Sequence, residues 1–187
     1  MNNKENVTPA NPKISGSIWR APYGTTIPTD STSDLDTKFK SLGYVSEEGV
    51  TNPNSPTYEN VKAWGGSIIY SYLSDRPDTF KFILYEALND EVLKTVYGDS
   101  RVTGSIDTSG IKVSVGAEQD EGYLYVIDMV LKAGILKRIV IPDGIVTSIG
   151  DISYKGNGLI GYEVTITCNS DSESNTHYEY ISKKSST

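Results

Sequence analysis

Residues 123–131, Tyr-Leu-Tyr-Val-Ile-Asp-Met-Val-Leu, constrain the fold more than any other segment of the chain. Apolar side chains occupy both odd and even positions, and Asp128 is the exception. Successive side chains of a strand point to opposite faces, so a strand of this composition has to be covered on both faces. The segment therefore predicts a central strand in a sheet with two packed faces.

Other segments show the alternation of half-buried strands. The segments with this pattern are residues 80–85, 111–115 and 160–168. Residues 135–141 and 145–154 predict two more strands, joined by a turn at Pro142-Asp143-Gly144. The residues Tyr154-Lys155-Gly156-Asn157-Gly158 predict a hairpin turn before the strand at 160–168. The fold class is therefore expected to be mainly β, as a sandwich or a barrel.

Two segments have the apolar spacing of short helices. Asn89 is a good N-cap, Leu88 and Leu93 stand at the hydrophobic staple positions around it, and Gly98 is a stop signal. This predicts one packed short α-helix. Leu35, Phe39 and Leu42 follow helical spacing more weakly after Ser33, with Gly43 as the stop.

The composition divides the chain into one domain with polar ends. Residues 1–16 predict a flexible N-terminal arm, residues 17–182 a β-sandwich domain, and residues 183–187 a polar C-terminal tail. The stretch Thr51-Asn52-Pro53-Asn54-Ser55-Pro56-Thr57 predicts a long polar loop, because its prolines cannot donate to a strand ladder.

The chain offers little for catalysis or metal binding. Of its 187 residues one is cysteine and one is histidine, which excludes an intrachain disulfide and a Cys/His zinc site. His177 stands in a polar stretch and is expected to be solvated, and Cys168 on the apolar side of its strand is expected to be a buried, inert thiol. No enzyme activity, cofactor or metal is therefore expected.

The same composition bears on location and partners. No apolar run approaches about 18 residues and the N-terminus lacks the apolar stretch of a signal peptide, so synthesis in a cytoplasm without membrane insertion is expected. The net charge is −7, which argues against binding to nucleic-acid phosphates.

Four blocks in the first half carry a resemblance to a known family. They are residues 18–30 (IWRAPYGTTIPTD), 39–50 (FKSLGYVSEEGV), 62–66 (KAWGG) and 80–86 (FKFILYE). In their order and spacing they resemble the major tail proteins, or tail tube proteins, of long non-contractile-tailed bacteriophages. The second half of the chain matches that family only in its β character.

The resemblance implies a structural virion protein made in the cytoplasm of a host bacterium. It implies a β-sandwich flanked by a helix, and hexameric rings that stack into a tube whose inner barrel is made by strands of six subunits. It also implies a tape-measure protein inside the tube, contacts with other phage tail proteins, and passage of DNA without tight binding.

With this resemblance, the residues suggest where subunits would meet. A loop from Gly49 to Trp64 would contact the neighbouring ring, and Trp19 is a further candidate for a subunit contact. The candidate contact residues are Trp19, Gly49, Thr51, Asn52, Pro53, Asn54, Pro56, Tyr58, Val61 and Trp64.

Charge is consistent with a conduit for DNA. Residues 1–66 carry 6 basic and 7 acidic groups, whereas residues 67–187 carry 11 and 17. An acidic lumen would repel phosphates, although the same charge also serves solubility. The alternatives are a β-sandwich carbohydrate-binding or adhesin module using some of the 13 tyrosines, a head–tail connector protein, and more remotely an enzyme.

Overall fold

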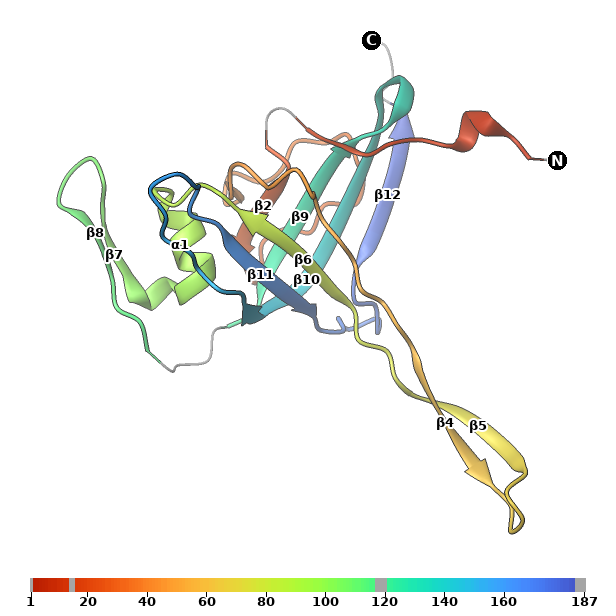
Figure 1. Ribbon diagram of the computed structural model, residues 1–187. Coiled ribbons are helices and arrows are strands. Elements are labelled where there is room, and N and C mark those ends of the chain that lie inside the picture. The colour runs from red at the N-terminus through yellow and green to blue at the C-terminus, as the bar shows by residue number, and fades with distance from the viewer. Residues whose placement is uncertain (1, 14–15, 117–120, 184–187) are drawn as a thin grey trace.

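The computed structural model describes residues 2–13, 16–116 and 121–183. Its centre is an eight-stranded antiparallel sheet (Figure 1). The strand order is β3 (Lys40–Ser41), β2 (Ile18–Pro22), β9 (Tyr123–Val130), β10 (Ile135–Ile149), β11 (Tyr162–Cys168) and β6 (Thr79–Leu84), with β1 (Asn11–Pro12) beside β9 and β12 (Tyr178–Lys183) beside β10. The predicted mainly β fold is confirmed.

The remaining elements lie outside this sheet. Two hairpins extend from the body in Figure 1. They are formed by β4 (Thr57–Lys62) with β5 (Ile68–Asp75) and by β7 (Val102–Ser105) with β8 (Gly110–Val113). Among the described residues, the helices are α1 (Asp90–Tyr97) and three short 3-10 turns, at Lys4–Asn6, Asp99–Arg101 and Lys132–Gly134. In the described part of the chain, no helix is long and apolar enough to cross a membrane.

Strand β9 is buried on both faces, as its sequence predicts. Tyr125 and Ile127 belong to a first core, and Leu124 and Val126 belong to a second core on the opposite face. Each of the four side chains is at most 2% exposed. The composition of β9 is therefore explained by its central place between two apolar layers.

The first core joins β6, β11 and the predicted helix. The alternation in β6 and β11 buries one side of each strand, and α1 adds Val92, Leu93 and Val96 to the same cluster. The Asn89 side chain accepts a hydrogen bond from the amide of Glu91, which confirms the predicted N-cap. The predicted staple is wrong, because Leu88 is 71% exposed.

Strand β10 corrects one prediction from the sequence. The expected turn at Pro142-Asp143-Gly144 lies inside a single strand of 15 residues, as a register shift between Ile141 and Gly144 in the pairing with β9. Asn169 holds this bulge, since its amide donates to the carbonyl of Asp143 at 2.8 Å. On one side of β10, β12 pairs with residues 135–140 and β11 pairs with residues 144–149. A bulge of this kind lets one strand pass from one half of a bent sheet to the other.

The weak helix expected at residues 35–42 does not form. Lys40 and Ser41 make strand β3 beside β2, and the Leu42 amide donates to the carbonyl of Ile18 at 2.9 Å. Leu35 and Phe39 pack on the second core. The apolar spacing in this segment thus reflects packing of an irregular chain on the sheet, which overrides a weak helical propensity.

Strand β1 and the end of β12 lie at the part of the sheet where β9 leads into β10 (Figure 1). The segment expected to form the N-terminal arm runs along the end of β9, where Asn11 pairs with Val130. The amide of Lys132 also donates to the Thr8 hydroxyl at 2.7 Å. Of the expected C-terminal tail, residues 184–187 lie outside the described residues.

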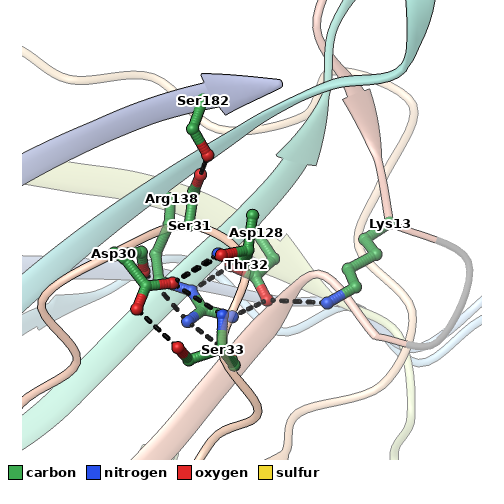
Figure 2. Close-up of polar contacts among 8 residues, drawn as sticks. All are labelled: Lys13, Asp30, Ser31, Thr32, Ser33, Asp128, Arg138 and Ser182. Carbon is green, nitrogen blue, oxygen red and sulfur yellow. Dashed lines mark hydrogen bonds and ion pairs between the residues drawn. The ribbon is translucent and has the colours of Figure 1, made fainter. Parts of the chain in front are cut away.

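A buried ion pair joins the two central strands (Figure 2). Asp128 of β9 is opposite Arg138 of β10, and the guanidinium donates to both carboxylate oxygens, at 2.7 and 3.0 Å. The two side chains are almost fully buried. Nη1 of Arg138 donates to the backbone carbonyls of Asp30 and Ser33, which fixes the 30–33 turn over the second core.

This arrangement predicts a large cost when one partner loses its charge. Asp128→Asn leaves the buried Arg138 without its anion and should lower the free energy of unfolding by about 3 to 5 kcal/mol. The measurement is denaturant unfolding of the free subunit. The matched control is Glu179→Gln, which breaks the more exposed pair with Lys137 on the same strand β10 and should cost at most about 1 kcal/mol. Equal losses for the two variants would contradict the role given to the buried pair.

Candidate assembly surface

The hairpin of β4 and β5 has no covered face. All residues of both strands are exposed, and the hairpin extends away from the body at the lower right of Figure 1. We call residues 57–75 the projecting hairpin. Three or more strands, or packing on another element, are usually needed to make such a pair stable in water. The projecting hairpin therefore needs either a binding partner or stabilising contacts between its own two strands.

The exposed surface of the projecting hairpin is unusually apolar. Large apolar side chains lie on both of its faces and at its turn, and Trp64 at the turn is fully exposed. The large apolar residues are Tyr58, Val61, Trp64, Ile68, Ile69, Tyr70, Tyr72 and Leu73. Contiguous exposed apolar surface of this kind marks interaction sites on proteins.

Cross-strand contacts give the projecting hairpin a defined register. The Tyr72 hydroxyl donates to the Glu59 carboxylate at 2.7 Å, which raises the pKa of Tyr72. On the other face Ser71 donates to the Asn60 side chain at 2.6 Å. The rings of Tyr70 and Tyr72 stack with centroids 6.1 Å apart. These contacts align the strands, and they leave the apolar faces uncovered.

The base of the projecting hairpin is attached to the sheet through β6. Thr51 and Lys81 exchange two backbone hydrogen bonds, at 2.9 and 2.8 Å, and the Thr79 amide donates to the carbonyl of Pro53 at 3.3 Å. Residues 44–54 thus cover the outer edge of β6, which would otherwise be an open sheet edge. The chain covers this edge and leaves the projecting hairpin open.

Asp78 is the main side-chain contact of this base. Its buried carboxylate accepts hydrogen bonds from Asn52 at 2.8 Å and Thr176 at 2.5 Å, and it is 2.5 Å from Nδ1 of His177. Burial alone would raise the pKa of Asp78, but these hydrogen bonds and the charge of His177 outweigh it and lower the pKa. The carboxylate therefore connects the hairpin base to the segment before β12.

The expectations for His177 and Cys168 have different outcomes. His177 was expected to be solvated, whereas its side chain is only 18% exposed, contacts the edge of Phe80 and pairs with Asp78. Asp78 could not be recognised as its partner from local sequence, because the two residues are 99 positions apart. Cys168 is buried as expected, and burial raises its pKa to about 12.

The structure places the candidate contact residues in several different settings. Those at the hairpin base are Thr51, Asn52, Pro53 and Asn54, and those on the projecting hairpin are Tyr58, Val61 and Trp64. Pro56 is exposed between these two groups, and Gly49 ends a turn in which its amide donates to the carbonyl of Ser46. Trp19 lies apart from them, packed against the second core.

The expected loop from Gly49 to Trp64 is wrong in its second half. Residues 57–62 form β4, and their partner β5 lies beyond the predicted loop. The signal was present in the sequence, because Gly65-Gly66 separates two strand-like runs. Both glycines have the positive φ angles that such a turn requires, 111° and 92°.

Comparison with known proteins agrees with a tail protein. A family model described as phage tail tube protein matches residues 1–187. Fifteen chains of solved structures match, among them one from the cryo-EM structure of the anti-feeding prophage cap (AFP tube terminating cap). That match has 12% identity and a TM-score of 0.41 and covers 84% of this chain and 92% of that chain. No curated protein matches. The match of the family model over the full length shows that the chain belongs to the phage tail tube protein family.

Proposed function

We propose that the chain polymerises as stacked hexameric rings into the tail tube of a long, non-contractile-tailed phage. Membership of the family makes it a structural tail protein. The observation that supports polymerisation is the projecting hairpin, which exposes apolar side chains on both faces. In a polymer, a neighbouring subunit would cover these side chains and supply the packing that a free two-stranded hairpin lacks.

The hairpin base is the part that makes such a contact reproducible. Ordering a mobile hairpin at each contact would cost conformational entropy. Here the backbone bonds of Thr51 to β6 and the side-chain bonds of Asp78 hold the base in one direction before assembly. Preorganisation of this kind favours binding because little freedom is lost in the complex.

The proposed tube conducts the phage genome and encloses a tape-measure protein. The net charge of −7 supports a lumen that repels DNA rather than holding it. Other phage tail proteins would cap the two ends of the tube. The protein would be made in the host cytoplasm and function in the virion.

The first prediction is concentration-dependent assembly through the projecting hairpin. Rings and tubes should appear in negative-stain micrographs as the protein is concentrated. Tyr58→Ser with Leu73→Ser removes a cross-strand apolar pair, and each lost side chain contributes about 1.5 kcal/mol or more when buried. The critical concentration should therefore rise at least about 100-fold. Trp64→Ser, which leaves both strands intact, should act in the same direction.

The matched control uses the neighbouring pair on the same hairpin face. Asn60→Thr with Ser71→Thr introduces two residues that favour strands and removes no apolar surface, so assembly should be close to that of the parent. A parent protein that stays monomeric at millimolar concentration would contradict the proposal and favour the carbohydrate-binding alternative. Assembly of the Tyr58/Leu73 variant at the parent's concentration would exclude the hairpin as the contact.

The second prediction concerns Asp78 at the hairpin base. Asp78→Asn removes the charge that accepts from Thr176 and Asn52, and should lower the free energy of unfolding by about 1.5 to 3 kcal/mol at pH 7. Because the folded-state pKa of Asp78 is lowered, its contribution is present above the unfolded value near pH 4 and is lost as the pH falls through the folded value. The variant should lack this acid-side loss.

Hydrogen exchange gives a local measurement for the same variant. The amides of Thr51 and Lys81 should exchange faster in Asp78→Asn, because the base is held less firmly. Asp75→Asn, an exposed change three residues away, is the control and should alter neither stability nor exchange. Unchanged protection in Asp78→Asn would show that the backbone bonds alone hold the base.

The third prediction concerns DNA. Neither free subunits nor tubes should bind duplex DNA at physiological salt with a dissociation constant below about 100 µM, because the chain carries an excess of seven negative charges. Fluorescence anisotropy of a labelled duplex measures this. Tight binding that weakens steeply with added salt would contradict the proposed repelling lumen.

A further inference from the structure

One asparagine of the chain is followed by glycine, and it lies in an exposed loop. Of the 11 asparagines in the sequence, only Asn157 precedes a glycine, Gly158. The pair lies between the end of β10 at Ile149 and the start of β11 at Tyr162, and residues 153–159 of this loop are all exposed. Solvent therefore reaches both the Asn157 side chain and the backbone amide that follows it.

Hydrogen bonds hold many of the other asparagine side chains, whereas Asn157 has no such bond within the described part of the chain. The Asn52 side chain donates to Asp78 at 2.8 Å, and the Asn169 side chain donates to Asp143 at 3.1 Å. Further asparagines whose side chains are held are Asn60, Asn89 and Asn175. The Asn157 side chain can therefore rotate toward the backbone of the next residue.

The fold does not require glycine at position 158. Gly158 is not among the residues with a positive φ angle, and a Cβ built there would meet one atom, Cβ of Lys155, at 3.8 Å. The Gly158 amide donates a long hydrogen bond to the carbonyl of Lys155, at 3.3 Å. The backbone nitrogen thus has no side chain beside it and is held weakly, which leaves it open to the Asn157 side chain.

We propose that Asn157 is a site of spontaneous deamidation. The backbone nitrogen of Gly158 attacks Cγ of Asn157, so that an N–Cγ bond forms and the Cγ–Nδ2 bond breaks. The proton of the Gly158 amide leaves with the side-chain nitrogen as ammonia. Water then opens the five-membered imide at one carbonyl to give aspartate, or at the other to give isoaspartate. The reaction consumes one water, releases one ammonia and requires no oxidant, cofactor or enzyme.

This modification changes the charge and the backbone length at one defined point. Each converted subunit changes from a net charge of −7 to −8. Isoaspartate also inserts one methylene group into the backbone between Tyr154, whose side chain shares a hydrogen bond with Tyr97 of α1, and the start of β11 at Tyr162. The inference goes beyond the proposed function and applies to the free subunit, whether or not tubes form.

Mass spectrometry of the full-length chain tests the proposal. The protein is incubated in mildly alkaline buffer made with ¹⁸O-labelled water and is then digested in ordinary water. The peptide that contains Asn157 should gain about 3 Da, because ring opening adds one labelled oxygen, whereas deamidation during digestion adds about 1 Da. Asn6, which is exposed and precedes the β-branched Val7, is the internal control and should react at least about tenfold more slowly.

Two alanine variants in the same loop isolate the role of Gly158. Gly158→Ala places a methyl group beside the attacking nitrogen and should slow the reaction at least about tenfold. Gly156→Ala is the matched control, because it keeps the Asn157-Gly158 pair, and it should react like the parent. Neither glycine has a positive φ angle, and an added Cβ meets nothing within 4 Å at Gly156, so both variants should fold.

The products of the reaction give a second measurement. Labelling by an isoaspartate methyltransferase should appear in the aged parent and in Gly156→Ala, because opening of an imide yields isoaspartate. Aspartate without isoaspartate would indicate direct hydrolysis and contradict the proposed attack by Gly158. An unchanged mass at Asn157, equal rates at Asn157 and Asn6, or a Gly158→Ala variant that reacts as fast as the parent would each overturn the proposal.

Discussion

The buried ion pair between Asp128 and Arg138 determines how the centre of the sheet is aligned. The alternation of apolar and polar residues usually sets strand register, because a shift by one residue moves every side chain to the other face. Strand β9 is apolar on both faces and carries little such information. The pair supplies it, since a shift by one residue would leave the aspartate and the arginine on opposite faces with no partner. The same guanidinium holds the 30–33 turn, so the cover of the second core depends on it too.

Outside this centre, the chain treats its exposed edges in two ways. Residues 44–54 run along β6 and satisfy its outer edge, and the turn at Ser46–Gly49 is part of that cover. The projecting hairpin has no such cover, although it exposes many large apolar side chains. The chain covers the edge of β6 but leaves the more apolar hairpin surface exposed. This contrast supports the interpretation of the hairpin surface as a contact site.

Local patterns in the sequence predicted the elements whose environment follows from their own residues. The two-faced burial of β9, the alternation of β11 and the cap of α1 at Asn89 are of this kind. The patterns failed where contacts with residues distant in the sequence determine the local structure. Asn169 holds the bulge that continues β10 through Pro142, and packing on the second core keeps Phe39 out of a helix. The pairing of Asp78 with His177 likewise depends on tertiary structure alone. For the hairpin, half of the surface was predicted, because the strand after Gly65-Gly66 was not connected with the one before it.

The line from the projecting hairpin through β6 and β11 has a mechanical consequence. In Figure 1 the hairpin continues the direction of these two strands, and α1 lies near their other end. A pull on the hairpin against the opposite end of the sheet would load the ladder between β6 and β11 parallel to its strands. Under such shear the six residue pairs of that ladder resist together instead of opening one after another. In the proposed tube, a hairpin that contacts a neighbouring subunit would thus pass tension directly into the strand ladder of its own sheet.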